Sequence, residues 1–163
     1  MDESKTRLLL NKAEKDIDHG RLLSAKRKLL PLVECKNAEA MFLYAIFSIN
    51  GDETEDEFDK RRLSLLSESS ELGYAPAIYG LAVCYYYGDG VEENRELSSS
   101  LFQLAAEKGY GKAKLSHAQN LFYGVNGVKR NRQLAYEYVH EAIAENIERA
   151  TDVLTEFEEQ GNG

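Results

Sequence analysis

The sequence has little of several residue types that define particular protein classes. It contains no tryptophan, two prolines and two cysteines, Cys35 and Cys84, in 163 residues. Two cysteines are too few for a disulfide framework, so we expect reduced thiols. The longest uncharged stretch, residues 72–88, falls short of the roughly 20 apolar residues that cross a bilayer. The first residues of the sequence also lack the apolar run of a signal peptide. The sequence therefore predicts a cytoplasmic protein that does not associate with membranes.

Basic residues are the other deficit. Lysine and arginine together number 20 against 28 acidic residues, which gives a formal net charge of −8. Nucleic-acid binders obtain much of their affinity from lysine and arginine side chains that neutralise phosphates, so the composition argues against that class. It is compatible with a partner protein that has a basic surface.

What the sequence does have is an internal repeat. Gly73 and Gly109 lie 36 positions apart, and a step of 37 reaches Asn146 in one direction and Lys36 in the other. Two columns of alanine follow the same period: Ala40, Ala77, Ala113 and Ala150 form one, and Ala45, Ala82 and Ala118 form the other. Self-similarity at this period is typical of a stacked helical solenoid.

Each period is interpreted as two helices. In the central copy a first helix over 75–87 carries a buried stripe, and the turn Gly88-Asp89-Gly90 ends it. Asn94 is the expected N-cap of a second helix, which Gly109 ends in a left-handed cap. The residues expected to face inward on this second helix are Leu97, Leu101, Leu104 and Ala105.

The flanking copies predict a single domain over 1–163. A diverged helix pair over 4–34 precedes repeats over 35–73, 74–109 and 110–146, and a capping helix over 147–160 follows. The first copy is expected to have helices over 38–50 and 58–72. Pro31 is expected to kink or shorten the second helix of the opening pair.

The central copy resembles a Sel1-like repeat, a relative of the tetratricopeptide repeat. The residues that carry the resemblance are Ala77, Leu81-Ala82, Tyr85, Gly88-Asp89-Gly90-Val91, Leu97-Ser98, Leu101-Phe102 and Ala105-Ala106-Glu107-Lys108-Gly109. The third copy matches through His117-Ala118, Gly127-Val128, Leu134-Ala135 and Ala142. The resemblance implies an all-α, right-handed α-solenoid of about four helix–turn–helix repeats with a C-terminal capping helix, and a protein-binding role.

A concave groove would be lined by the first helix of each repeat. Rotation along these helices favours the following residues as a partner-binding set: Phe42, Ile46, Tyr79, Val83, Tyr86, Leu115, Gln119 and Phe122. Aromatic residues suit recognition because they bury much area with little loss of entropy. The alternative is that these side chains complete the core, since apolar helix stripes are usually buried.

An acidic turn is the second candidate surface. The residues expected to contact a partner there are Asp52, Glu53, Glu55, Asp56 and Glu57. They are interpreted as a solvated loop, or as an electrostatic contact for a basic partner. Calcium binding is a weaker alternative, because the glycine and glutamate positions of a helix–loop–helix calcium loop are missing.

No motif for catalysis, metal binding or a cofactor is recognised in the sequence. The three histidines are scattered, and neither a nucleophile elbow nor a phosphate-binding loop occurs. We therefore expect a non-catalytic protein–protein interaction module that needs no cofactor. Its sharpest form is a small acidic inhibitor or immunity protein of a basic toxin. A general adaptor is the alternative. A hydrolase, an activity that the resemblance implies for cysteine-rich secreted members of the family, is less favoured because this chain lacks their paired cysteines.

Overall fold

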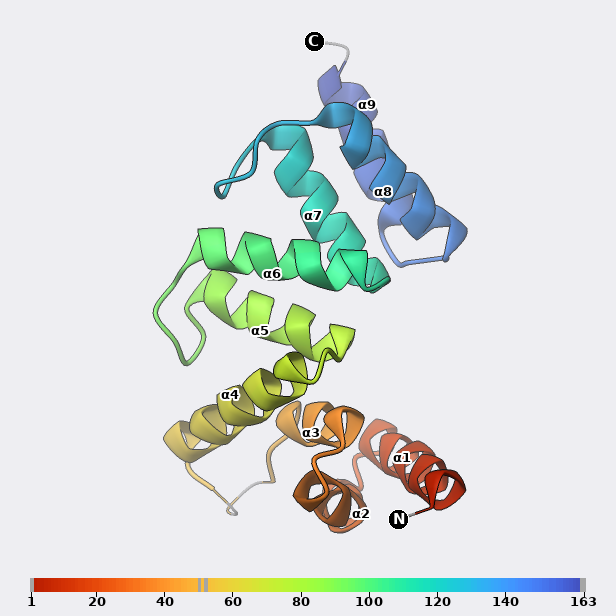
Figure 1. The fold of residues 1–163 in the computed structure, drawn as a ribbon, viewed down its shortest axis with the longest axis vertical. Coiled ribbons are helices and arrows are strands. Elements are labelled where there is room, and N and C mark those ends of the chain that lie inside the picture. The colour runs from red at the N-terminus through yellow and green to blue at the C-terminus, as the bar shows by residue number, and fades with distance from the viewer. Residues whose placement is uncertain (1, 50, 52, 162–163) are drawn as a thin grey trace. The chain divides into compact units, whose positions relative to one another are not determined.

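The computed structural model describes residues 2–49, 51 and 53–161, which form nine α-helices and no strand. The helices are α1 (Glu3–Asp18), α2 (Leu22–Glu34), α3 (Ala38–Ala45), α4 (Glu55–Glu71), α5 (Ala75–Tyr87), α6 (Arg95–Glu107), α7 (Gly111–Tyr123), α8 (Arg132–Ala144) and α9 (Ala150–Gly161). The all-α fold that the repeat predicted is confirmed (Figure 1).

The chain divides into two compact units. Unit 1 spans Met1–Ala77, and unit 2 spans Ile78–Gly163. Within unit 1, α1 packs on α2, α2 on α3 and α3 on α4. Within unit 2, α6 packs on α7, α7 on α8, and α9 on both α7 and α8 (Figure 1). Within each unit, most of these packed pairs are successive helices, as expected of helical hairpins joined by short turns.

The alanine columns of the repeat are buried. Ala40, Ala45, Ala77, Ala82, Ala113 and Ala118 have no exposed surface, and Ala150 has almost none. A small side chain allows neighbouring helix backbones to approach closely, and a larger one would leave no room in a densely packed interior. The sequence period therefore marks where the helices touch.

Helix ends in the repeats use the caps that the sequence predicted. Gly73, Gly109 and Asn146 have left-handed backbone angles, with φ of 82°, 85° and 55°. Side-chain oxygens of Asn94 and Asn131 accept hydrogen bonds from the backbone N–H groups of Leu97 and Leu134, at 2.9 and 3.1 Å. These bonds satisfy donors that the first helical turn leaves without partners.

Two predicted helix boundaries in the first copy were wrong. The helix expected over 38–50 stops at Ala45, and the one expected over 58–72 begins three residues earlier, at Glu55. Arg61 explains the early stop, because its guanidinium donates to the carbonyls of Tyr44 and Phe47 at 2.5 and 2.9 Å. Pro31 does not shorten α2, which continues to Glu34.

The prediction of which face of α6 is buried was also wrong. Leu97 and Leu104 are 39% and 40% exposed, whereas Phe102 is buried in their place. Ser98 is buried as well, and its hydroxyl donates to the carbonyl of Ala82 on α5 at 2.8 Å. Of the four residues expected to face inward, only Ala105 has no exposed surface, and Leu101 is half-buried.

Candidate functional site

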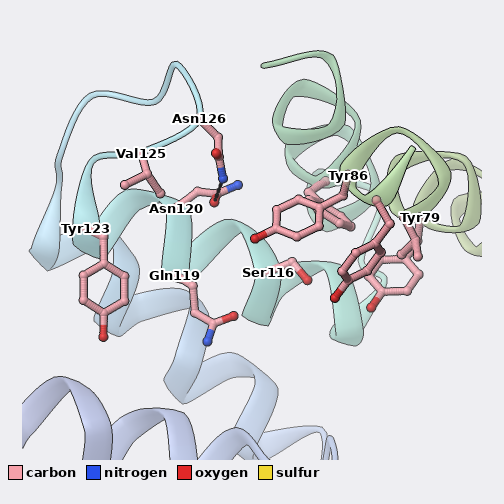
Figure 2. Close-up of a pocket in the computed structure, with 11 residues that line it drawn as sticks. Tyr79, Tyr86, Ser116, Gln119, Asn120, Tyr123, Val125 and Asn126 are labelled. Atoms are coloured by element: carbon pink, nitrogen blue, oxygen red, sulfur yellow. Dashed lines mark hydrogen bonds between the residues drawn. The ribbon is translucent and has the colours of Figure 1, made fainter. Parts of the chain in front are cut away.

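A groove runs along one face of α7 in unit 2. Its larger part is a cavity of about 390 Å³ (Figure 2). The lining comes from α5 (Tyr79, Val83, Tyr86 and Tyr87), α6 (Phe102), α7 (Ser116, Gln119, Asn120 and Tyr123) and the segment after α7 (Val125 and Asn126). None of these side chains carries a formal charge, although the chain as a whole is acidic.

A second cavity of about 260 Å³ continues the first. The two share Tyr79, Ser116 and Gln119, so they form one depression, which we call the α7 groove. The second cavity adds Lys112, Leu115, Glu148, Arg149 and Val153 to the lining. The groove therefore has an uncharged tyrosine end and a charged end beside the start of α9.

The tyrosine end is built from rings that pack on one another. The ring of Tyr79 lies 5.4 Å from that of Phe102 and 5.2 Å from that of Tyr110, centroid to centroid. Burial raises the pKa of the Tyr110 phenol, and the nearby Tyr79 raises it further. Tyr86 contacts Tyr87 edge to face, and the guanidinium of Arg95 lies 4.9 Å from the Tyr86 ring centroid. Such mutual contacts hold the rings in place before a ligand arrives.

Two hydrogen-bonded asparagines also line the tyrosine end. Asn120 is buried, and its amide nitrogen donates to the Ser99 hydroxyl at 2.9 Å. Its amide oxygen accepts from the Asn126 side chain at 2.8 Å, as the dashed line in Figure 2 shows. Asn126 has a left-handed backbone with φ of 54°, a conformation that asparagine tolerates better than most residues. Neither asparagine was predicted from the sequence as a binding residue.

Tyr123 closes the groove against α9. Its hydroxyl donates to the carboxylate of Glu156, and this hydrogen bond raises the pKa of Tyr123 to about 12. The charged hydrogen bond therefore joins the last turn of α7 to α9. Gln119, one helical turn earlier on α7, has no hydrogen-bond partner among the described residues, so its amide is available in the groove.

The predicted partner-binding residues fall into three groups. Tyr79, Val83, Tyr86 and Gln119 line the larger cavity together. Leu115 is nearly buried and lines the second cavity. Phe122 has no exposed surface, so the alternative assignment, that it belongs to the core, holds for this residue.

Phe42 and Ile46 lie in unit 1, on and directly after α3. Phe42 is half-buried against the ring of Tyr74, at 5.6 Å between centroids. Ile46 is 49% exposed. Of the two, Ile46 presents more surface to a partner.

The predicted acidic turn is partly the first turn of a helix. Asp52 lies outside the described residues. Glu53 forms a two-pronged ion pair with Arg61, at 2.6 and 2.9 Å. Glu57 and Thr54 cap the start of α4 reciprocally, and the hydrogen bonds from the Thr54 backbone and hydroxyl lower the pKa of Glu57. Glu55 and Asp56 are exposed in the same helical turn.

Other chemistry-bearing groups do not converge on the groove. Among the described residues no three histidine, cysteine, aspartate or glutamate side chains are arranged to hold a metal ion. Cys35 is exposed and Cys84 is buried, and neither forms a disulfide. Within the same residues, no helix has the length and apolar character needed to span a membrane.

Comparisons with known proteins agree with this architecture. Residues 75–110 and 112–147 each match the model of the Sel1 repeat. A Sel1 repeat protein from Oxalobacter formigenes is 28% identical, and the match covers 80% of this chain and 96% of that one with a TM-score of 0.70. Cysteine rich protein B of Helicobacter pylori gives a TM-score of 0.59 over 88% of this chain and 96% of its own. At 15% identity that likeness concerns the fold alone.

The stacked helical hairpins define a helical-repeat protein of the α-solenoid class. The chain contains two Sel1 repeats, at residues 75–110 and 112–147, as the residues of these two hairpins predicted. Repeats of this family generally serve as protein–protein interaction modules.

A curated relative covers part of the chain. The chitin synthase regulator SKT5 of Malassezia restricta is 30% identical over 101 residues, which make up 61% of this chain. This chain spans only 7% of the length of that protein. The shared part is therefore a small region of a much longer protein.

Proposed function

We propose that the chain is a non-catalytic binding module whose α7 groove holds an extended segment of a partner protein. The observation that carries this proposal is the lining of the tyrosine end, which combines packed aromatic rings with an amide that has no internal partner. Aromatic rings offer a large contact area, and hydrogen-bonding groups orient the ligand. A polypeptide segment supplies apolar side chains for the rings and main-chain groups for the amide.

The preset geometry of the groove supports this role. Tyr79 and Tyr86 are held by other rings, and Asn120 by two hydrogen bonds, so little freedom is lost when a partner binds. Tyr87, which is 71% exposed at the rim, offers further apolar surface. In unit 1, exposed Ile46 and half-buried Phe42 are proposed as additional contacts.

The charge of the chain supports a partner with a basic surface. The net charge is −8, and exposed Glu92 and Glu96 lie in and after the turn between α5 and α6. Exposed Glu55 and Asp56 add acidic surface in unit 1. Such charges speed the encounter with a basic protein. The sharper form of the proposal is an inhibitor, such as an immunity protein, that neutralises a basic toxin.

A general adaptor is the second candidate. The similarity to a region of a protein named as a chitin synthase regulator favours it, since a regulator acts through another protein. The two candidates differ in the number of partners, because an inhibitor has one dominant target and an adaptor has several.

Site-specific photocrosslinking in the native host tests the proposed function. A benzoylphenylalanine in place of Tyr87, at the groove rim, should capture one dominant protein if the chain is an inhibitor and several if it is an adaptor. The same probe in place of exposed Glu158 on α9 is the matched control. It should capture none of the proteins that the probe at position 87 captures. A Gln119→Trp change that fills the groove should abolish capture at position 87. Capture that persists in this variant would contradict groove binding.

A further inference from the structure

We propose that the bound segment carries a carboxylate within about five residues of an apolar or aromatic side chain, and that Lys112 and Arg149 bind this carboxylate. The inference rests on the proposed function, namely that the α7 groove holds an extended segment. It adds the chemistry that the segment must present and the place where each part lies.

The two ends of the groove differ in charge. The tyrosine end has no charged side chain in its lining, so it accepts an uncharged group. The other end has two cations, Lys112 and Arg149, and one anion, Glu148. The lining of this end is therefore positive by one charge, although unit 2 as a whole is acidic.

Neither cation is used inside the protein. Lys112 and Arg149 are exposed, and within the described ranges neither forms an ion pair or a side-chain hydrogen bond. Lys114, two residues further along α7, contrasts with them because it is buried between Glu141 and Glu145. The acidic side chains of α8 thus neutralise Lys114 and leave Lys112 free to meet a ligand.

The backbone conformation at Arg149 also supports a binding role for its side chain. Its φ is 67°, in the left-handed region that glycine and asparagine adopt most readily. Its carbonyl accepts the N–H of Val153 at 3.0 Å, so the first turn of α9 fixes this conformation. An arginine at a position where glycine or asparagine would be less strained indicates that the side chain itself is needed.

The length of the groove sets the largest spacing within the segment. Lys112, Ser116, Gln119 and Tyr123 lie on one face of α7, and the first and last are eleven positions apart. At a rise of about 1.5 Å per residue, this face is about 16 Å long. An extended segment advances about 3.3 Å per residue, so about five residues span it. Ser116 and Gln119 lie between the two ends, where the main chain of the segment would pass.

A carboxylate at this end is compatible with a basic partner. Net charge acts on the approach of two proteins, and salt screens it beyond about 8 Å at physiological ionic strength. Contacts inside a groove are shorter than that, so the two local cations decide which side chain fits there. The net charge of the whole chain would predict a basic residue of the partner at the charged end of the groove. The two local cations predict an acidic residue there, so the two predictions can be told apart by experiment.

Selection from a peptide library tests the inference. A library of random displayed decapeptides is selected on the immobilised full chain, and peptides that also bind the groove-filling Gln119→Trp variant are discarded. We expect the retained peptides to share an aromatic or large apolar residue and an aspartate or glutamate within about five positions of it. Replacing that acid by its amide in synthetic peptides should weaken binding about threefold to tenfold.

Charge variants of the chain assign the effect to the two cations. Lys112→Gln combined with Arg149→Asn should remove the preference for acid over amide, and asparagine suits the left-handed backbone at position 149. Lys129→Gln changes an exposed lysine outside both cavities and should leave the preference intact.

The possible failures are distinguishable. Groove-dependent peptides that lack the acid, or that carry a basic residue in its place, would overturn the inference and leave the proposed function standing. A preference for acid that survives the double variant would also overturn it. If no peptide distinguishes the chain from Gln119→Trp, the proposed function fails and the inference fails with it.

Discussion

The rings of Phe122 and Phe157 stack face to face, with centroids 3.9 Å apart and planes 6° from parallel. Phe122 belongs to α7 and Phe157 to α9, and neither has exposed surface. Tyr136 and Tyr123 surround the pair, and each meets the Phe157 ring edge to face. This cluster anchors α9 to α7. Because Arg149 directly precedes α9, the cluster also fixes the charged end of the α7 groove.

Replacing Phe157 with alanine should destabilise unit 2 strongly. Removal of a fully buried phenylalanine leaves a cavity and typically lowers the free energy of unfolding by about 3–5 kcal/mol. Phe157→Leu should cost less, since it retains most of the volume. Urea unfolding followed by circular dichroism measures both changes. Glu158→Ala, at the neighbouring exposed position, should alter the free energy by less than about 0.5 kcal/mol and serves as the control.

Phe122→Ala should have a similar effect, and the double variant should lose less than the sum of the two. The shared stack is lost in either single variant, so the second change removes less. Strict additivity would mean that the two rings contribute independently, contrary to the observed contact.

Most of the fold could be predicted from the repeat period of the sequence. Each repeat needs glycine or asparagine where a helix ends and alanine where helices touch. These residue types therefore recur at fixed positions in the sequence. The bounds of α5 are those the sequence predicted, because a glycine-rich turn marks where the helix ends.

The face that each helix buries was harder to predict. On α6 two stripes fit the helical period, one with Leu97 and Leu104 and one with Ser98 and Phe102. Hydrophobicity favours the leucines. The structure buries the second stripe because small residues allow close packing and the Ser98 hydroxyl finds the Ala82 carbonyl.

The candidate site was predicted in part for a related reason. Tyr79, Val83, Tyr86 and Gln119 follow from rotation along two helices of known register. Asn126 and Arg149 lie in connections between helices, where helical periodicity does not predict which way a side chain points. Their backbone angles and their place in the groove required coordinates.

His117 should make the stability of the chain depend on pH. The side chain is buried, its Nδ1 atom has no hydrogen-bond partner, and its ring meets that of Tyr138 edge to face at 5.3 Å. Burial lowers the pKa of His117 below its ordinary value of 6.5, and the charge of Glu107 opposes this shift only partly. The unfolded chain therefore binds a proton at a higher pH than the folded chain.

We expect the free energy of unfolding to fall as the pH drops below about 6.5, by at most about 1.4 kcal/mol per pH unit from this group. At pH 7.5 and higher the histidine is almost entirely neutral in both states and contributes almost no slope. Urea titrations between pH 7.5 and 5 measure the effect. His117→Phe should flatten the profile, and His140→Gln, at an exposed position, should not. An unchanged slope in His117→Phe would assign the pH dependence to other groups.

The ion triad of Lys114 should respond asymmetrically to mutation. Its ammonium is 2.7 Å from carboxylate oxygens of both Glu141 and Glu145, and the lysine side chain is 8% exposed against 57% and 41% for the glutamates. Burial alone would lower the pKa of Lys114, but the two hydrogen-bonded carboxylates outweigh burial and raise it.

Removing both carboxylates leaves a buried charge without a partner, whereas removing the lysine leaves two glutamates that water can solvate. Glu141→Gln with Glu145→Gln should therefore lower the free energy of unfolding by more than about 2 kcal/mol. Lys114→Met, which keeps the apolar stem, should cost less than about 1 kcal/mol. Denaturant unfolding of the two variants in parallel gives the comparison, and the reverse order would contradict the triad as described.

Arg61 should be essential to the end of α3. Its guanidinium pairs with Glu53 through two nitrogens, donates to the carbonyls of Tyr44 and Phe47, and lies 4.1 Å from the centre of the Tyr44 ring. A lysine keeps the charge but lacks the planar fork, so it cannot make all of these contacts at once. Arg61→Lys is expected to lower the free energy of unfolding by about 2–3 kcal/mol.

Hydrogen exchange locates this loss. Amides at the end of α3 and in the first turn of α4 should exchange faster in Arg61→Lys, while those of α7 and α8 in unit 2 should keep their protection, because the contacts of Arg61 named above all lie in unit 1. Lys60→Gln is the matched control, since Lys60 is exposed on the same turn of α4. Equal protection in Arg61→Lys and the wild type would show that α3 ends at Ala45 for a reason other than these hydrogen bonds.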